Sequence, residues 1–321
     1  MALLHNNVKN LQEMIDIMFE ISQKYRIKFG LAKSKHLIIG GTKGMTEKDK
    51  TLKLGNDILE QVDFYKYLGM HVNQGYNLKT HIPKLEEKVM GAIYSILNTT
   101  NDLALQRIEM RTIWIMLENT INAILTYGLE AYKMDKTDYD ELNRIQLKGI
   151  RVLLNLPDNV ANEIILSETG IKQIDLEIKK NRIIYEKDLR ERFGNESQDS
   201  EILETAHNIY KKWKDQIKND KVELGLVESD MNQTKECLKR CIKEKLNIIM
   251  KDRIVAATAK KSTVKAYIEK MLNSKEEIAC RKEYIDDLSR AQVKNIIIAR
   301  ASRLQTKNNH AYKHDNLKCR W

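Results

Sequence analysis

Proline and cysteine are both scarce in this sequence. Only two prolines, Pro83 and Pro157, occur in 321 residues. So few helix breakers over this length favour a mostly helical structure. The four cysteines are too few and too scattered for a disulfide scaffold, which favours a reducing compartment.

Long apolar runs and targeting signals are also missing. No apolar run approaches the roughly 20 residues that a helix needs to span a bilayer. The segment from Met1 to His5 lacks a basic region followed by a full apolar core, so it does not read as a secretory signal. We therefore expect no membrane partner and an intracellular location, in the nucleus or the cytoplasm.

Several enzyme signatures are absent from the chain. The sequence has no Gly-rich phosphate loop, no G-x-S-x-G elbow and no H-E-x-x-H metalloprotease motif. Nothing in it therefore supports a hydrolase or a dinucleotide-dependent enzyme.

Charge is the compositional feature that stands out. The chain has a formal net charge of +10, and 31% of its residues are charged. A basic balance fits a polyanion partner, although lysine-rich helical surfaces produce the same balance. The hydrophobic content of 42% is sufficient for a core, and the length suggests two domains as a prior.

The residue pattern of positions 1–75 predicts a small α+β region. Apolar residues recur at helical spacing from about Val8 to Tyr25. Short strands are expected at Lys28-Phe29 and from His36 to Ile39, and Gly55-Asn56 suits a two-residue hairpin turn. Alternating residues from Val62 to Val72, interrupted by Gly69, predict a half-buried strand that turns at the glycine.

The remainder of the chain predicts helices. Expected helices run from Pro83 to Leu97, from Leu105 to Leu125, from Asp138 to Asn155, around Ile178 to Phe193 and around Ile202 to Ile217, followed by a last group within 234–304. The second of these is apolar nearly all round between Ile113 and Leu125, which implies burial on several sides. Residues 221–233 show little periodicity and form our candidate linker.

The order of four segments carries a family resemblance. They are F-G-L-A-K-S-K-H-L-I-I-G-G from Phe29, F-x-K-Y-L-G from Phe64, T-Y-G-L-E-A-Y from Thr126 and L-N-R-I-Q-L-K-G-I-R-V-L-L-N-L-P from Leu142. In this order they resemble the carboxyl-terminal half of a reverse transcriptase from non-LTR, LINE-type retrotransposons. The resemblance covers roughly half of the chain and continues weakly to its end.

The resemblance implies a mainly α fold in three parts. Residues 1–75 would be a truncated palm remnant, 76–171 a helical thumb-like region, and 172–321 a helical carboxyl-terminal region with a basic tail. The family is an RNA-directed DNA polymerase that uses Mg²⁺ and binds an RNA template and a DNA primer. Its catalytic Tyr-x-Asp-Asp hairpin lies just before the segment that Met1 to Leu4 resembles, so we expect this chain to bind no metal and to be inactive alone.

Two segments of this chain match functional motifs of the family. Lys33 corresponds to the lysine of motif D, which the resemblance implicates in protonating the leaving pyrophosphate. Tyr67, Leu68 and Gly69 resemble motif E, the primer grip, in which Gly69 would permit close approach of the backbone to a sugar or phosphate, with Phe64 and Leu68 as apolar anchors beneath. A solvated loop lysine and a purely structural hairpin remain the alternatives.

Three other groups of residues are weaker candidates for a metal site. Tyr284-Ile285-Asp286-Asp287 spells Tyr-x-Asp-Asp, but apolar residues around it recur at helical spacing, and adjacent helical carboxylates point about 100° apart. His310, His314 and Cys319 lack a fourth ligand for structural zinc. Cys237 and Cys241, four residues apart, are expected to be small buried residues and not metal ligands.

The basic carboxyl-terminal segment is a further candidate nucleic-acid contact. Residues 291–321 contain seven Lys or Arg residues and one acidic residue. Arg300, Arg303 and Lys307, together with Lys35 near the amino terminus, would contact phosphates. Basic chain termini are also often merely disordered, and this alternative stays open. Two alternatives for the whole chain also stay open. The first is an exapted protein that binds RNA or DNA, or that interacts with another protein, for example to complete a polymerase in trans. The second is a decayed element without a selected role.

Overall fold

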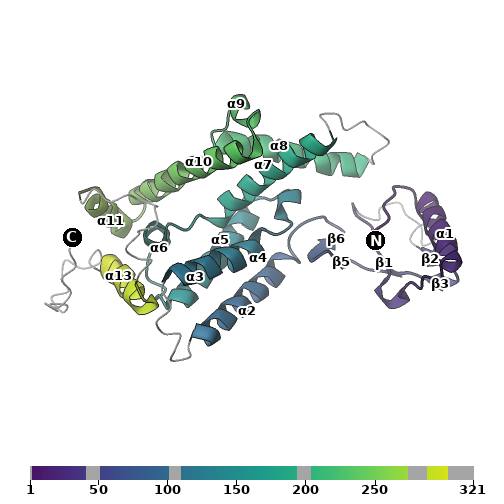
Figure 1. Ribbon diagram of the computed structural model, residues 1–321, viewed down its shortest axis with the longest axis horizontal. Helices are drawn as coiled ribbons and strands as arrows, with labels where there is room; N and C mark the ends of the chain where they lie inside the picture. The colour runs from purple at the N-terminus through teal and green to yellow at the C-terminus, as the bar shows by residue number, and fades with distance from the viewer. Residues whose placement is uncertain (1, 41–50, 101–109, 194–203, 274–287, 303–321) are drawn as a thin grey trace. The chain divides into compact units, whose positions relative to one another are not determined.

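The chain is mostly helical, with a few small strands near its amino terminus, as expected. The computed structural model describes residues 2–40, 51–100, 110–193, 204–273 and 288–302 (Figure 1). These residues form two compact units. Unit 1 contains the described residues of Met1–Lys84, Tyr132–Met134 and Glu196–Asp215, and unit 2 contains those of Leu85–Ala131, Asp135–Asn195 and Gln216–Trp321.

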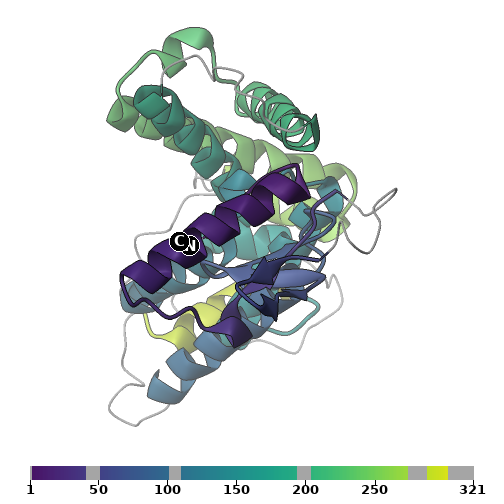
Figure 2. The same ribbon diagram turned by 90° about the vertical axis from the view of Figure 1, so that its right-hand side faces the viewer.

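Unit 1 combines one long helix with six short strands. Its elements are α1 (Val8–Lys24), the 3₁₀ turn η1 (Leu31–Lys33), β1 (Lys35–His36), β2 (Lys53–Leu54), β3 (Asp57–Ile58), β4 (Glu60–Gln61), β5 (Phe64–Tyr67) and β6 (Met70–Asn73). The strands pair as β1 with β4 in parallel, β2 with β3 antiparallel and β5 with β6 antiparallel. Figure 2 shows α1 beside these strands.

Helix α1 begins where its sequence provides a cap. The Asn7 side chain accepts hydrogen bonds from the main-chain amides of Lys9 and Asn10, which would otherwise lack partners. Along the helix, the Gln12 amide exchanges two hydrogen bonds with the main chain of Lys53, at 2.9 and 2.8 Å. Since Lys53 lies in β2, this pairing fixes the helix against the edge of the strand.

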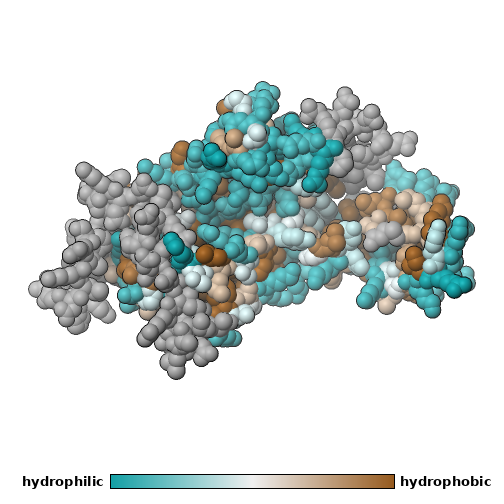
Figure 3. Space-filling view, in the orientation of Figure 1, coloured by the Kyte–Doolittle hydropathy of each residue, from teal (hydrophilic) through white to brown (hydrophobic). Residues whose placement is uncertain are grey.

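The core of unit 1 is small. Its buried members are Ile15, Leu52, Leu54 and Leu59, and the partly buried residues around them are Leu3, Val8, Leu11, Phe19 and Phe29. On another face of α1, Ile17 and Ile21 are exposed, as is Tyr25 directly after the helix. Figure 3 shows hydrophobic residues at the surface near α1, in contrast to the mostly hydrophilic surface over α8, α9 and α10. Only part of the apolar surface of α1 is therefore covered.

The predicted turn at Gly55-Asn56 is confirmed. It joins β2 to β3, with Leu54 opposite Asp57. Gly55 has a φ of +63°, and a Cβ at this position would lie 2.6 Å from the Phe19 ring. The position therefore requires glycine for two reasons, its backbone conformation and the packing of α1 on the turn.

Unit 2 is helical throughout its described part. In order it contains α2 (Ile82–Thr100), α3 (Met110–Met116), a π-helical turn (Leu117–Asn122), α4 (Ala123–Thr126), η4 (Leu129–Ala131), α5 (Lys136–Leu154), α6 (Asn162–Thr169), α7 (Ile174–Phe193), α9 (Glu228–Met231), α10 (Lys235–Ala256), η5 (Ala257–Ala259), α11 (Ser262–Asn273) and α13 (Arg290–Ser302). The first residues of α2 and the first half of α8 (Glu204–Glu223) belong to unit 1.

Helix α5 lies in the core of unit 2, and its ends follow sequence signals. Asp135 and Asp138 form a capping box at its start, and Asn155 ends it in the left-handed conformation. Gly149 faces α2: a Cβ there would lie 2.7 Å from the Ile93 side chain. The two helices therefore approach closely because α5 has glycine at the crossing.

Four details of the predicted elements are corrected. Lys28-Phe29 is not a strand, and the strand near His36 has only two residues. The apolar segment around residues 113–125 was expected to be buried on several sides, but half of Ile115 is exposed, and the segment contains a π-helical turn. The candidate linker at 221–233 is wrong: α8 continues to Glu223, and the short helix α9 follows before α10 begins.

None of the helices in the described part of the chain combines the length and apolar character needed to cross a membrane.

Candidate nucleic-acid interface

The lysine loop and the glycine hairpin of unit 1 lie side by side. Lys33 ends the 3₁₀ turn η1, which is closed by hydrogen bonds from the Lys33 and Ser34 amides to the Gly30 carbonyl. The Tyr65 hydroxyl, from β5, donates a hydrogen bond of 2.9 Å to the Lys33 main-chain carbonyl. Two segments that the sequence nominated separately are thus connected directly.

The hairpin of β5 and β6 has the tightest type of turn. Tyr67 pairs with Met70, so only Leu68 and Gly69 form the loop. Both residues have positive φ, +46° and +89°, as in a type I′ turn. The expected turn at Gly69 is confirmed, and the leucine that precedes it occupies a conformation that residues with a side chain rarely adopt.

The residues expected to anchor this hairpin are instead exposed. Phe64 is 55% exposed and Leu68 is 73% exposed. Tyr67, at the end of β5, is 39% exposed. The buried residues of the hairpin are Met70 and Asn73, at the two ends of β6. The prediction of apolar anchors at Phe64 and Leu68 was therefore wrong, since the alternation of apolar residues does not reveal which face of a two-stranded ribbon is covered.

The three lysines near the hairpin differ in their partners. Lys35, on β1, forms an ion pair with Glu60 of β4. The exposed side chains of Lys33 and Lys66 form no ion pair with residues that the structure describes. An ammonium without a carboxylate partner can bind a phosphate without first losing an ion pair, so Lys33 and Lys66 are the better candidates and Lys35 the weaker one.

A polar loop supports the opposite strand of the hairpin. Asn73, buried at the end of β6, donates hydrogen bonds to the Asn77 carbonyl at 3.0 Å and to the Thr80 hydroxyl at 3.2 Å. The Nδ1 atoms of His71 and His81 lie 3.3 Å apart. These contacts join β6 to the chain immediately before α2, so the hairpin projects from a fixed base.

The carboxyl-terminal candidates lie elsewhere. Arg300, on α13, is 9% exposed, and its guanidinium binds both carboxylate oxygens of Glu168 at 2.5 Å. Glu168 also accepts a 2.5 Å hydrogen bond from the Tyr267 hydroxyl. Contrary to expectation, Arg300 therefore does not present its charge to a phosphate. Arg303, Lys307, Tyr284 to Asp287 and the 310–319 cluster lie outside the described residues.

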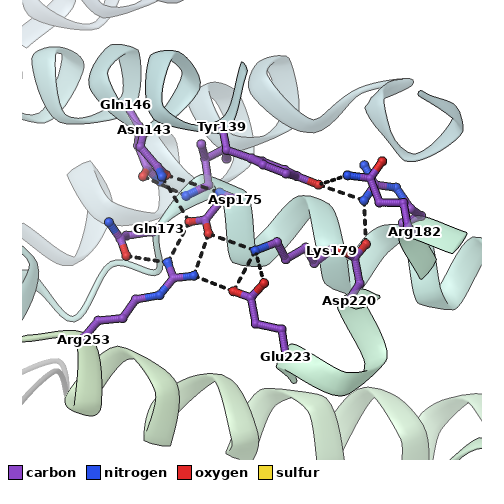
Figure 4. A network of polar contacts seen from close by, with 12 residues as sticks. Tyr139, Asn143, Gln146, Gln173, Asp175, Lys179, Arg182, Asp220, Glu223 and Arg253 are labelled. Atoms are coloured by element: carbon purple, nitrogen blue, oxygen red, sulfur yellow. Dashed lines mark hydrogen bonds and ion pairs between the residues drawn. The ribbon is translucent and has the colours of Figure 1, made fainter. Parts of the chain in front are cut away.

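Sequence reasoning missed a buried network of ion pairs in unit 2 (Figure 4). Four polar residues of α7, namely Asp175, Lys179, Arg182 and Glu186, are each less than a tenth exposed. Arg182 binds Asp220 of α8 at 2.5 Å, and Lys179 binds Glu223 at 2.8 Å. In the sequence, these four residues show only a helical spacing of four, three and four positions. The solvent-exposed face of a charged helix has the same spacing, so the sequence does not reveal that they are buried.

Asp175 is the best connected member of this network. It receives two hydrogen bonds from Arg253 of α10, of 3.1 and 2.8 Å, and one of 3.2 Å from Asn143 of α5. Burial alone would raise its pKa, but the Arg253 hydrogen bonds and charge, together with Lys179, outweigh burial and lower the pKa of Asp175. Each of the four α7 side chains has an oppositely charged partner on α8 or α10, so the network joins these helices.

Tyr139 of α5 belongs to the same network. Its hydroxyl accepts hydrogen bonds from Arg182 at 2.8 Å and from Gln216 at 3.2 Å. Burial raises the pKa of Tyr139, with Arg182 acting in the opposite direction.

Among the described residues, no three His, Cys, Asp or Glu side chains gather where they could hold a metal ion. Cys237 is exposed and Cys241 is partly buried, so the prediction that both are buried was wrong.

Comparisons with known proteins supply no identification. The chain matches no protein-family model, no curated protein and no solved structure.

Proposed function

We propose that this chain descends from the reverse transcriptase of a non-LTR retrotransposon and retains the ability to bind a nucleic-acid backbone through unit 1. The order of its sequence segments supports the descent. The observation that carries the binding proposal is the hydrogen bond from Tyr65 to the Lys33 carbonyl. It links the segments that resemble motifs D and E, which a shared ligand would require.

In this proposal, Lys33 and Lys66 bind phosphates, and Tyr67 with the Gly69 turn contacts the sugar-phosphate backbone. Gly69 has no side chain, so its main chain can approach a ligand closely. The partner is an RNA template paired with a DNA primer, or RNA and DNA more generally, and the place of action is the nucleus or the cytoplasm. A net charge of +10 supports a polyanionic partner.

We further propose that the isolated chain does not polymerise. Polymerases of this kind need two carboxylates that hold Mg²⁺ together with the nucleotide phosphates. The only Tyr-x-Asp-Asp sequence, at Tyr284 to Asp287, lies in a segment of helical periodicity. No step proposed for this chain passes through a metal ion.

Fluorescence anisotropy with a labelled RNA–DNA duplex tests binding. The affinity should fall steeply with log salt, because bound lysines displace counterions from the phosphates. Lys33→Ala and Lys66→Ala should each reduce the slope by about 1. Lys35→Ala should leave the slope unchanged because Glu60 already neutralises that ammonium, and Lys53→Ala, outside the loop and the hairpin, is the matched control.

The alternatives predict other results. A decayed element without a selected role predicts no salt-dependent binding by any variant. Primer extension with Mg²⁺ or Mn²⁺ tests the second part of the proposal, and nucleotide incorporation by the purified chain would refute it.

A further inference from the structure

We infer that the β5–β6 hairpin binds an unpaired nucleotide, with its base stacked on Phe64 and its phosphate bound by Lys66. This inference rests on the proposed function and specifies its ligand, a nucleic acid that has a single-stranded part beside the duplex. Three features of the hairpin lead to it.

First, an aromatic and a basic residue share one face of β5. Successive residues of a strand point to opposite sides, so Phe64 and Lys66 project together and Tyr65 and Tyr67 project to the other side. Tyr65 reaches the Lys33 carbonyl on its side. Phe64 and Lys66 remain exposed, although their cross-strand neighbours Asn73 and His71 are covered by the chain before α2.

Second, the tip of the hairpin combines exposure with backbone strain. Leu68 is 73% exposed and has a φ of +46°. An Asn or Gly would suit this turn position better, and an exposed leucine gains nothing by burial. Strained residues of this kind concentrate at ligand-binding sites. We therefore assign Leu68 an apolar contact with a neighbouring nucleotide of the unpaired segment, because four strand residues of about 3.3 Å each separate it from Phe64.

Third, the charge of the hairpin indicates which kind of ligand it binds. Lys66 is the one Lys, Arg, Asp or Glu in residues 64–73, and no carboxylate of the described residues pairs with it. An aromatic side chain beside an unneutralised lysine matches a base with its phosphate. The bases of a duplex stack on one another, so an unpaired base offers Phe64 a free face, as in single-strand binding proteins.

Anisotropy with three labelled probes tests the inference on the full chain. The probes are an RNA–DNA duplex with an unpaired 5′ extension, the same duplex with an abasic extension, and a blunt duplex. The unmodified chain should bind the first probe most tightly, the abasic probe less tightly because it offers only the phosphates, and the blunt duplex least tightly. Phe64→Ala should weaken binding to the first probe at least about fivefold, because stacking contributes about 1–3 kcal/mol per base. It should change binding to the other two probes little.

Three further variants complete the experiment. Phe64→Trp preserves an aromatic face and should retain the preference for the extension. Ile58→Ala removes another exposed apolar side chain of unit 1, 64% exposed on β3, and should change nothing. Lys66→Ala should weaken binding to all three probes.

The outcomes separate this inference from the function on which it rests. If the chain binds all probes equally with a steep salt dependence, or if Phe64→Ala affects all probes equally, the stacking site is refuted and backbone binding stands. The same holds if Phe64 and Leu68 serve a protein partner, since their loss would then leave every probe unaffected. Absence of any salt-dependent binding refutes both.

Discussion

Arg253 of α10 holds Asp175 of α7 through two hydrogen bonds, of 3.1 and 2.8 Å, inside a shell of other polar groups. The pair joins two helices whose contacting residues are 78 positions apart in the sequence. Because the Asp175 carboxylate is buried, removal of the Arg253 charge would leave it without its main partner. This relationship makes the stability of unit 2 depend on pH.

Arg253→Met should destabilise the chain by about 3–5 kcal/mol at pH 7, since it leaves a buried carboxylate without its main partner. The folded-state pKa of Asp175 is lowered, so the stabilisation is present above its ordinary pKa of 3.8 and is lost as the pH falls through the folded value. The difference between the two proteins should therefore shrink below pH 4.

Urea denaturation of both proteins between pH 7 and pH 3 measures this effect. Arg240→Met, which removes an exposed arginine from the same helix, is the control and should cost less than about 0.5 kcal/mol at any pH. A constant difference between the Arg253 variant and the unmodified chain over the whole range would contradict the role given to Asp175.

Arg300 should prove to be a structural residue. Arg300→Met leaves Glu168 buried without its partner and should destabilise by about 3–5 kcal/mol, whereas the double variant Arg300→Met/Glu168→Leu should recover a large part of this loss. Denaturation of the two single variants and the double variant gives the coupling energy. Lys294→Met, on the same helix, is the control, and additive effects would show that the pair is not coupled.

Gly55 should tolerate no side chain. Gly55→Ala introduces a Cβ 2.6 Å from the Phe19 ring at a φ of +63°, and should destabilise by about 1–3 kcal/mol. Gly30→Ala is the matched control, because a Cβ there meets nothing within 4 Å and the φ is −80°. Equal thermal stability of the two variants would show that the packing of α1 on the β2–β3 turn is not as described.

Leu68 should be a residue whose replacement stabilises the fold. Leu68→Asn relieves a side chain held at a positive φ and should increase the free energy of unfolding by about 0.5–1 kcal/mol. The same change should weaken binding to a duplex with an unpaired extension. A variant that is less stable than the unmodified chain would indicate that Leu68 has packing contacts that its exposure conceals.

Tyr65→Phe tests the link between the loop and the hairpin. The loss of one hydrogen bond should cost about 0.5–1.5 kcal/mol of stability or less, since the donor group disappears together with the bond. The affinity for a duplex should fall severalfold because the Lys33 loop is no longer held, while the salt slope stays unchanged because no charge is lost. Tyr25→Phe, which removes an exposed hydroxyl group outside the loop and the hairpin, is the control.

Local signals predicted much of this fold. The helix that begins at Val8, the turn at Gly55 and the end of α5 near Asn155 all depend on residues close in sequence, and all three lie where they were expected. The connection between α8 and α10 was misread as a linker because α9 has only four residues, too few to show a period.

Long-range contacts could not be predicted in the same way. The positions of Asp175, Asp220 and Arg253 reveal charge, but only the packing of three helices decides which charges are buried together. Phe64 shows the reverse case, because an aromatic residue in an alternating strand reads as a buried anchor until the neighbouring layers are known. The sequence therefore nominated the segments of the candidate site, but it did not indicate which of their side chains are exposed.

Photo-crosslinking of the full chain to a labelled RNA–DNA duplex with an unpaired extension tests the central claim most directly, when the crosslinked residues are identified by mass spectrometry. Binding through the lysine loop and the hairpin predicts crosslinks within residues 30–36 and 64–70, which decrease with rising salt. Crosslinks confined to other parts of the chain, with none in these two segments, would contradict the account.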